Sequence, residues 1–341
     1  MRTGDEVCAA GAAGDEVCAA VVAGGGVTSA SVADDDECAA AVAELASRFG
    51  QPGAALTATG AAALEVALEI FGIGRGDEVA VPDLGCHALA AAVVRAGATP
   101  VFIGVGPSLT LNPADVASCW SRRTRAVIVP HQYGLPCDVR GIVAAVPPDA
   151  VVIEDVAQTW GSYAGEAVSG ATGVLAVTSF GPSKPVALGA GGAVLGPVGL
   201  LAGAVAQDGA GDRLLDRVPS PARFPRPLLE RLPGALRRAD ERLAARRAVV
   251  REFLTGELSA CFRLPPLPPD SGAGWTRLPL YPLPPVSGMP VRELRRILEP
   301  LGPVQELHAV PPSGLPMFRR VEKVIFPGGK RPADPLLVKP T

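Results

Sequence analysis

The sequence is poor in aromatic residues, in lysine and in net charge. Phe, Trp and Tyr make up only 4% of its 341 residues, so its core has to be built mainly from Ala, Val, Leu and Ile. The formal net charge is -3 at pH 7, which leaves no overall basic field to attract nucleic acid or anionic lipid. Hydrophobic residues reach 48%, which excludes disorder along the whole chain. We therefore expect a large folded protein whose partners are small molecules.

The chain also lacks metal-binding spacing, and we expect neither a disulfide framework nor a secretory leader. It has three histidines and seven cysteines without a CxxC or HExxH motif, and no metal is predicted. Scattered cysteines in odd number and an acidic start favour reduced thiols in a cytoplasmic protein. The uncharged stretch 185–207 has the length of a membrane span, but its glycines and two prolines favour a buried strand, a turn and a helix start.

Composition divides the chain into three parts. Residues 1–33 form a Gly- and Ala-rich arm in which GDEVCAA occurs twice, and we expect a flexible tail. Residues 34–228 are predicted to be a large domain that begins with a helix ending near Gly50, followed by a helix from Thr59 to Gly72. In residues 229–341, a long basic helix, short strands and a further helix predict a smaller C-terminal α+β domain.

Short apolar runs such as EVAVP, RAVIVP and AVVIED alternate with helical segments such as HALAAAVVRAG and DVRGIVAAV. This alternation predicts an α/β fold with a mostly parallel sheet covered on both faces. Ligands of such sheets bind beyond the carboxyl ends of the strands, so polar residues that close the runs are site candidates. These residues are Asp83, His131, Glu154, Asp155 and Ser179.

Lys184 is the only lysine among the first 322 residues, although the chain contains 31 Lys and Arg residues. An amine can lose its proton when desolvated and condense with an aldehyde, whereas a guanidinium stays protonated. The position therefore favours Schiff-base chemistry over a need for positive charge alone. An ordinary surface lysine in the turn SFGPSK is the alternative interpretation.

Motifs on both sides of Lys184 occur in a fixed order: TGAAALEVAL, GIGRGDEVAVP, AGATPVFIGV, TRAVIVPHQYGLPCD, VVIEDVAQTWGSYAG, SFGPSK and GAGG. In this order they resemble the DegT/DnrJ/EryC1/StrS family of sugar aminotransferases, which are pyridoxal-phosphate enzymes of fold type I. The resemblance extends from about Asp36 to Pro197 and is loose in the C-terminal third. It implies an aspartate aminotransferase-like fold and a homodimer with pyridoxal 5'-phosphate near the subunit boundary.

The resemblance assigns three residues to the cofactor ring. Lys184 matches the catalytic lysine that forms the Schiff base and moves a proton between carbons. Asp155 matches the carboxylate that pairs with the pyridine nitrogen and keeps it protonated. Gln158 matches the residue beside the phenolic oxygen.

A second group matches the cup that holds the cofactor's phosphate. Thr59, Gly60 and Ala61 stand at a predicted helix start, where free N–H groups and the helix dipole favour an anion. Ser179 would add a hydroxyl. Ala61 replaces a threonine of the family's motif, so one hydroxyl is lost from the cup.

The sequence departs from the family's pattern at the position whose side chain stacks on the face of the cofactor ring. In PDLGCHALA, Cys86 aligns with the aromatic residue that stacks on the cofactor, and His87 follows it. We expect Cys86 to pack as a small buried hydrophobe; stacking by His87 after a one-residue shift of the loop is the alternative. Ala190 in GAGG replaces an acidic residue. These changes weaken the case for the usual substrates more than the case for the cofactor.

Other positions are less specific. Asn112, the only asparagine, lies in the wrong segment to be the amide that the family commonly sends to the phosphate of the neighbouring subunit. Arg223 or Arg226 falls near that element and could contact the phosphate instead, or could be an exposed solubilising charge. His131 matches a motif near the substrate, but a hydrogen-bonded histidine at a strand end explains it equally well. His308 has no metal-ligand spacing near it.

Together these residues predict a pyridoxal-phosphate-dependent aminotransferase that moves an amino group from an amino acid, with glutamate expected, to a keto sugar or related cyclic ketone. Two alternatives stay open. The same cofactor supports elimination, replacement or decarboxylation, with which the altered Cys86, Ala61 and Ala190 positions are compatible. A non-catalytic relative could also retain the fold, although Lys184 and Asp155 together argue against it.

Overall fold

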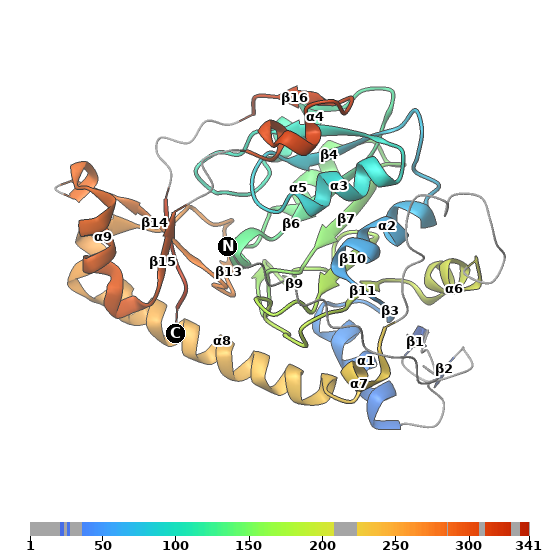
Figure 1. The fold of residues 1–341 in the computed structure, drawn as a ribbon, viewed down its shortest axis with the longest axis horizontal. Helices are drawn as coiled ribbons and strands as arrows, with labels where there is room; N and C mark the ends of the chain where they lie inside the picture. Colours follow the sequence, from blue (N-terminus) through green and yellow to red (C-terminus); the bar gives the residue numbers. More distant parts are fainter. Residues whose placement is uncertain are drawn as a thin grey trace, which may run out of the picture.

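A computed structural model describes residues 21–23, 26–27, 36–207, 224–284, 286–306, 311–328 and 335–340. They form a large sheet with helices on both sides, and a smaller sheet beside it that is built by the C-terminal third (Figure 1). Most of the predicted arm, residues 1–33, lies outside the described residues. Two short strands in it are described, β1 (Val21–Ala23) and β2 (Gly26–Val27).

The large sheet has ten strands and is parallel over most of its width. Besides β1 and β2 it contains β3 (Gly53–Thr57), β4 (Glu78–Pro82), β5 (Thr99–Ile103), β6 (Thr124–Pro130), β7 (Val151–Asp155), β10 (Leu175–Ser179), β11 (Gly192–Leu195) and β16 (Val324–Phe326). The order is β16, β5, β4, β6, β7, β10, β11, β3, β1, β2, and pairing is parallel from β16 to β10 and antiparallel beyond. The predicted mostly parallel sheet is confirmed.

Helices cover both faces of this sheet because side chains alternate along its strands. In β4, Val79 and Val81 belong to the core under one set of helices, whereas Ala80 belongs to the core on the opposite face. The first set is α2 (Gly60–Ile70), α3 (Ala88–Arg95) and α6 (Val198–Gln207). The second is α1 (Asp36–Arg48), α4 (Pro113–Cys119) and α5 (Val139–Ala145).

The helices predicted near residues 34–50 and 59–72 are α1 and α2. Thr59 caps α2, because its hydroxyl accepts a hydrogen bond from the Ala62 N–H at 3.0 Å. The uncharged stretch 185–207 divides into β11 and α6, as predicted. Among the described residues, no helix combines the length and the apolarity that crossing a bilayer requires.

The C-terminal third builds the smaller sheet. Two helices precede it, α7 (Arg226–Leu229) and the long α8 (Leu232–Thr255), and α9 (Val291–Leu298) packs beside it. Its antiparallel strands follow the order β12 (Phe262–Arg263), β14 (Leu278–Pro282), β17 (Leu336–Val338), β15 (Val304–Glu306). The long basic helix, the strand in TRLPLY and the helix in VRELRRILEPLG are confirmed.

Two features tie this third to the large domain. The strand β16 returns to pair in parallel with β5 at the edge of the large sheet. A three-stranded sheet joins β13 (Ser271–Gly272) to β8 (Tyr163–Ala164) and β9 (Ala167–Val168). The domain boundary near residue 228 stays a prediction. Short 3-10 helices occupy Gln132–Gly134, Glu257–Ala260, Val286–Gly288, Glu299–Leu301, Pro312–Gly314 and Pro316–Phe318.

Candidate active site

The candidate site lies where β6, β7 and β10 end and β11 begins. In the sheet register Asp155 pairs with Pro130 on one side and with Val177 on the other, and Ser179 pairs with Gly192. Carboxyl ends of parallel strands meet at one edge, so the strand-end residues chosen from the sequence lie together there.

Asp155 closes β7 and is partly buried. Its Oδ1 accepts a hydrogen bond from the Ala157 N–H at 2.9 Å. Burial raises the pKa of Asp155, although the charge of Lys184 and the Ala157 N–H both favour the ionised form. The charge of Lys184, which follows β10, thus acts on the carboxylate at the end of the adjacent strand β7.

Lys184 stands in the turn that follows β10. Its backbone N–H donates to the Gly181 carbonyl at 3.0 Å, and its side chain is partly buried. A methyl group on Gly181 would lie 3.7 Å from both the Lys184 Cγ and the Ser179 Oγ, so the two side chains run past the same glycine. The assignment of Lys184 as the Schiff-base lysine stays a prediction, and its partial burial beside Ser179 is compatible with it.

The start of α2 packs directly on the end of β10. A Cβ on Gly60 would lie 2.6 Å from the Ser179 Cβ and 3.0 Å from its Oγ. A Cβ on Gly192, the last glycine of GAGG, would lie 2.7 Å from the Gly60 nitrogen. Both positions therefore require glycine. The structure brings Thr59, Gly60 and Ser179 together as the sequence predicts, and Ala61 follows in the first turn of α2.

Gln158 is fixed by contacts that the sequence did not reveal. Its Oε1 accepts from the Tyr133 N–H at 3.2 Å, and its Nε2 donates to the Gln132 Oε1 at 3.4 Å. Its carbonyl accepts from the Thr276 hydroxyl at 2.6 Å, across 118 residues. The side-chain amide is held by backbone and by a second amide, which leaves its orientation well defined.

The loop after β4 corrects one expectation. Cys86 is exposed, so the prediction that it packs as a small buried hydrophobe is wrong. His87 is also exposed and stands at the start of α3 without a capping bond from its side chain. The loop approaches the site closely, because a Cβ on Gly85 would lie 2.1 Å from the Gln132 Nε2. Its small residues allow that approach.

The same loop is held by the C-terminal segment. The Asp83 carboxylate accepts from the Ser313 N–H at 2.8 Å and from the Ser313 hydroxyl at 2.6 Å. The Lys323 ammonium donates to the Ser313 carbonyl. Asp83 therefore links the loop that carries Cys86 to a segment 230 residues away, a partner that no sequence pattern indicated.

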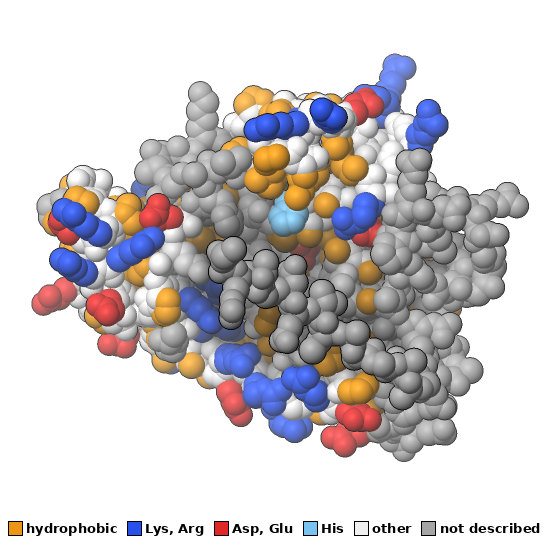
Figure 2. Space-filling view, in the orientation of Figure 1, with side chains coloured by type: hydrophobic (Ala, Val, Ile, Leu, Met, Phe, Trp, Pro, Cys, Tyr) orange, Lys and Arg blue, Asp and Glu red, His pale blue; other side chains and the backbone are white. Residues whose placement is uncertain are grey.

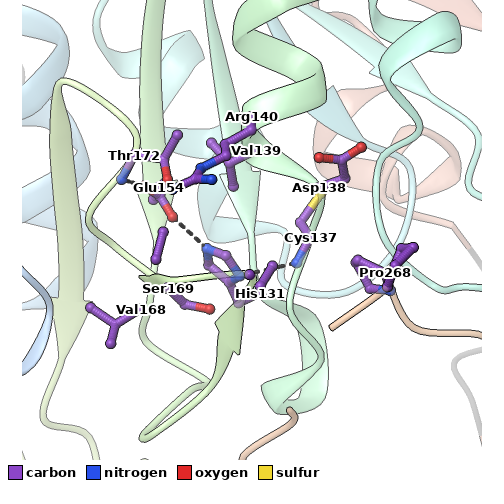
Figure 3. A pocket seen from close by; sticks show the side chains of 14 residues that line it. His131, Cys137, Asp138, Val139, Arg140, Glu154, Val168, Ser169, Thr172 and Pro268 are labelled. Atoms are coloured by element: carbon purple, nitrogen blue, oxygen red, sulfur yellow. Dashed lines mark hydrogen bonds and ion pairs between the residues drawn. The ribbon is translucent and has the colours of Figure 1, made fainter. Parts of the chain in front are cut away.

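His131 is buried and saturated with hydrogen bonds. Its Nε2 lies 2.7 Å from the Glu154 Oε2, and its Nδ1 accepts from the Cys137 N–H at 3.2 Å (Figure 3). Because Nδ1 is an acceptor, Nε2 carries the proton and donates it to Glu154. With 1% of its surface exposed, His131 fits the alternative of a hydrogen-bonded histidine at a strand end better than a substrate contact.

Glu154 anchors the loop beyond β9. Besides His131 it accepts from the N–H groups of Gly170, Thr172 and Gly173 at 2.6 to 2.7 Å. Burial alone would raise the pKa of Glu154, but the His131 hydrogen bond and these N–H groups outweigh it and hold the pKa below its ordinary value. The pair lines a cavity of about 160 Å³ to which Asp155 and Lys184 do not contribute (Figure 3).

Three residues of the sequence analysis cannot be placed. Arg223 and His308 lie outside the described residues, and of Arg226 only the backbone is described. Ala190 is exposed between Gly189 and Gly191, both of which have a positive φ. Asn112 caps α4 by accepting from the Ala114 N–H at 2.8 Å, which accounts for it locally.

Comparison with known proteins identifies relatives that match 40 to 45% of the chain. It is 39% identical over 140 residues to a pleiotropic regulatory protein of Geobacillus stearothermophilus, covering 40% of this chain and 37% of that protein. It is 40% identical over 156 residues to the UDP-N-acetyl-3-dehydro-alpha-D-glucosamine 3-aminotransferase of Acidithiobacillus ferrooxidans, covering 45% and 42%. It is 39% identical over 149 residues to the L-glutamine:2-deoxy-scyllo-inosose aminotransferase of Streptomyces fradiae, covering 43% and 35%.

The chain thus spans less than half the length of these curated relatives in the matched regions. A solved structure covers more: DesV of S. venezuelae, crystallised with a ketimine intermediate, superposes with a TM-score of 0.73 at 26% identity over 91% of this chain and 86% of that one. The fold of the described residues is that of this group of aminotransferases. The family model for DegT/DnrJ/EryC1/StrS aminotransferases matches residues 33–205, about half of the chain, and the chain therefore belongs to that family.

Proposed function

We propose that this protein is a pyridoxal-phosphate-dependent aminotransferase that moves an amino group from an amino acid to a keto sugar or a related cyclic ketone. The observation that carries the proposal is the placement of Asp155, at the carboxyl end of β7, and Lys184, in the turn after the adjacent strand β10, at one edge of the sheet. A primary amine can condense with an aldehyde, and a carboxylate can hold a protonated ring nitrogen. Membership of an aminotransferase family supports the same assignment.

The residues present fit a phosphate-bearing aromatic aldehyde. The cradle between Gly60, Gly192 and Ser179 would be filled by a Cβ at either glycine, and it adjoins the N-terminal end of an eleven-residue helix, which favours an anion. Asp155 is a half-buried acid whose ionised form is favoured by the charge of Lys184. Phosphate and ring nitrogen thus have complementary partners at the two ends of the site.

Each residue then has a defined task. When bound, the cofactor supplies a ring that stabilises the charge left on a substrate carbon after proton loss. The Lys184 Nζ takes that proton as a general base and returns it as a general acid. Asp155 keeps the ring nitrogen protonated, and Gln158, oriented by Tyr133, donates toward the phenolic oxygen. Thr59, Gly60, Ala61 and Ser179 hold the phosphate.

The named relatives suggest the class of substrate. One of them acts, by its name, on a nucleotide-linked sugar, and another on a cyclitol with glutamine as the donor. We propose that this chain also aminates a cyclic ketone of biosynthesis, with glutamate or glutamine as the donor. We further propose that it works as a homodimer, as the family resemblance implies.

A visible absorption spectrum tests the cofactor assignment. We expect the purified protein to give a yellow band with pyridoxal phosphate, and borohydride to remove the band by fixing the cofactor to the chain. Lys184→Ala should lose both the band and the covalent product, whereas Lys339→Ala, which changes an exposed lysine, should keep them. A wild type without the band, or a Lys184→Ala variant that retains it, would refute the assignment.

A different reaction on the same cofactor is the second candidate, because an exposed Cys86 takes the place of the expected stacking aromatic. Transamination converts glutamate into 2-oxoglutarate, one molecule for each amino group transferred. Decarboxylation instead releases carbon dioxide, and elimination or replacement breaks a substrate bond without forming the oxo acid. A yellow protein that forms no oxo acid from glutamate or glutamine would favour this candidate, or a regulatory role like that named for one relative.

A further inference from the structure

The helix α8 carries an arginine where its buried stripe requires an apolar residue. The buried side chains of the helix are Leu232, Ala235, Leu236, Ala239, Arg246, Val250 and Phe253, all on the face that packs against the two cores. Arg246 is the only charged member of this set and is 8% exposed. Arginine is almost never this buried without a partner that balances its charge.

Arg246 has no such partner among the described residues. Its Nε donates to the Gly274 carbonyl at 3.0 Å, and its Nη2 is buried without a hydrogen bond. No described carboxylate lies within ion-pair distance of Arg246 or of its cationic neighbours Arg242, Arg247 and Arg277. Burial, followed by the charges of these three neighbours, lowers the pKa of Arg246 to about 10.

Within the part of the chain that the structure describes, the guanidinium groups of two of the neighbours donate to backbone oxygen. The Arg247 Nη2 donates to the Gly161 carbonyl at 2.8 Å, and the Arg277 Nη1 to the Thr276 carbonyl at 2.9 Å. Each guanidinium has five N–H donors, so most of the donors remain for another acceptor. Figure 2 shows Lys and Arg side chains gathered over α8 on the exposed surface, in line with a local excess of positive charge.

The backbone of residues 274–277 adjoins the candidate active site through hydrogen bonds. The Arg277 N–H donates to the Tyr133 carbonyl at 3.2 Å, and the Tyr133 N–H donates to the Gln158 side chain. Gly274, which accepts from Arg246, donates to the Gly134 carbonyl at 2.9 Å. The chain segment that carries Arg277 is therefore one residue removed from the glutamine assigned to the phenolic oxygen.

The backbone at this junction is strained. Tyr133 has a φ of 59° and Trp275 a φ of 49°, in the left-handed region that bulky residues rarely adopt. The two turns touch, because a Cβ on Gly134 would lie 2.8 Å from the Trp275 nitrogen. Tyr133 and Trp275, both with left-handed backbone conformation, thus lie beside two arginines. Arg246 is buried without an ion pair to any described residue, and Arg277 is half-buried.

We propose that Arg277 and Arg246 form an anion subsite of this enzyme, in which Arg277 binds a phosphate or carboxylate group of a substrate and Arg246 supplies fixed positive charge behind it. Arg277 is the half-buried member and can be reached from solvent, whereas Arg246 is locked on the Gly274 carbonyl. A guanidinium matches both oxyanions with two parallel hydrogen bonds. The subsite deepens the proposed function, on which the identity of the anion as a substrate group rests.

Binding of simple anions to the protein without cofactor tests the subsite by itself. We would titrate inorganic pyrophosphate, as the probe for a nucleotide-linked acceptor, and glutarate, as the probe for a dicarboxylic donor, by isothermal calorimetry at low salt. We expect one probe to bind and Arg277→Gln to weaken it by about tenfold or more, since bonds to charged groups are worth this much. Arg246→Lys keeps the positive charge but loses the planar guanidinium with its paired N–H donors. It should weaken binding of the probe less than Arg246→Gln does.

Arg251→Gln is the matched control, because Arg251 is an exposed arginine of the same helix. It should bind the probe as the wild type does. If Arg246→Gln does not fold, as judged by circular dichroism, Arg277→Gln and Arg246→Lys decide the matter. A wild type that binds neither probe, or variants at positions 277 and 246 that bind as the control does, would overturn the subsite. Because no cofactor is present, that result leaves the assignment of Lys184 untouched.

Discussion

Glu154 and Asp155 are consecutive residues of β7 whose carboxylates serve opposite faces of the large sheet. Glu154 bonds to His131 and to three backbone N–H groups, whereas the charge of Lys184 acts on Asp155. Alternation along a strand explains the separation. Glu154 is therefore held by the structure beside the candidate site, whereas Asp155, bonded to the Ala157 N–H, is the acid that we propose for chemistry within it.

We predict that Glu154→Gln lowers the free energy of unfolding by about 3 kcal/mol, because hydrogen bonds to a charged acceptor are each worth about 1.5 to 3 kcal/mol. Both carboxylate oxygens accept: Oε2 from His131 and Gly170, and Oε1 from Thr172 and Gly173. A glutamine has to turn its NH₂ group toward one of these pairs of donors. Urea denaturation measures the change, with the exposed Glu69→Gln in α2 as the control; equal losses in both variants would contradict it.

The same contact predicts a pH dependence. The pKa of Glu154 is held below its unfolded value of 4.5, so its contribution to stability is complete above pH 4.5 and is lost as the pH falls through the folded value. The difference between wild type and Glu154→Gln should therefore shrink as the pH falls below 4.5. A difference that is constant from pH 3 to pH 7 would show that the charge of Glu154 is not its cause.

The sequence predicts the strand-end residues well, but not which of two neighbouring acids faces the site. The alternating pattern places Glu154 and Asp155 on opposite faces, yet both faces of a parallel sheet are covered by helices and the sequence pattern is the same on each. Family motifs selected Asp155. Contacts with the C-terminal third could not be predicted, because periodicity describes local structure and the bonds from Ser313 to Asp83 and from Thr276 to Gln158 join distant segments.

Gly60→Ala should damage the phosphate cup. A Cβ there would lie 2.6 Å from the Ser179 Cβ, and relief of that overlap has to move α2 or β10 at a cost of about 1 to 3 kcal/mol. We expect lower stability and weaker binding of pyridoxal phosphate, measured by urea denaturation and by titration of the visible band. Gly199→Ala is the control, since a Cβ on Gly199 in α6 meets nothing within 4 Å. Normal cofactor binding by Gly60→Ala would remove Gly60 from the cup.

Asp155→Asn should separate stability from cofactor binding. Burial raises the pKa of Asp155, so the ionised carboxylate costs folding energy at pH 8 and this cost disappears as the pH falls below its ordinary value of 3.8. Without cofactor, the variant should be more stable than the wild type at pH 8, by about 1 kcal/mol, and equal to it at low pH.

With pyridoxal phosphate the order should reverse, because only the wild type offers a carboxylate to the ring nitrogen. Thermal unfolding of the wild type and of Asp155→Asn, each with and without the cofactor, gives the four stabilities that this comparison needs. An Asp155→Asn variant that gains as much stability from the cofactor as the wild type would show that this carboxylate does not pair with the ring.

Cys86 offers a chemical probe of the ring face. Its thiol is exposed, whereas Cys38 and Cys137 are buried, and burial raises the pKa of Cys137 to about 12. We expect a thiol reagent such as Ellman's reagent to modify Cys86 rapidly, and the difference between wild type and Cys86→Ser isolates its rate. If Cys86 occupies the place of the stacking aromatic, bound pyridoxal phosphate covers it and slows the modification severalfold. Lys184→Ala cannot bind the cofactor covalently, so in this variant pyridoxal phosphate should protect Cys86 less. If saturating pyridoxal phosphate leaves the rate of Cys86 modification in the wild type unchanged, Cys86 lies away from the ring.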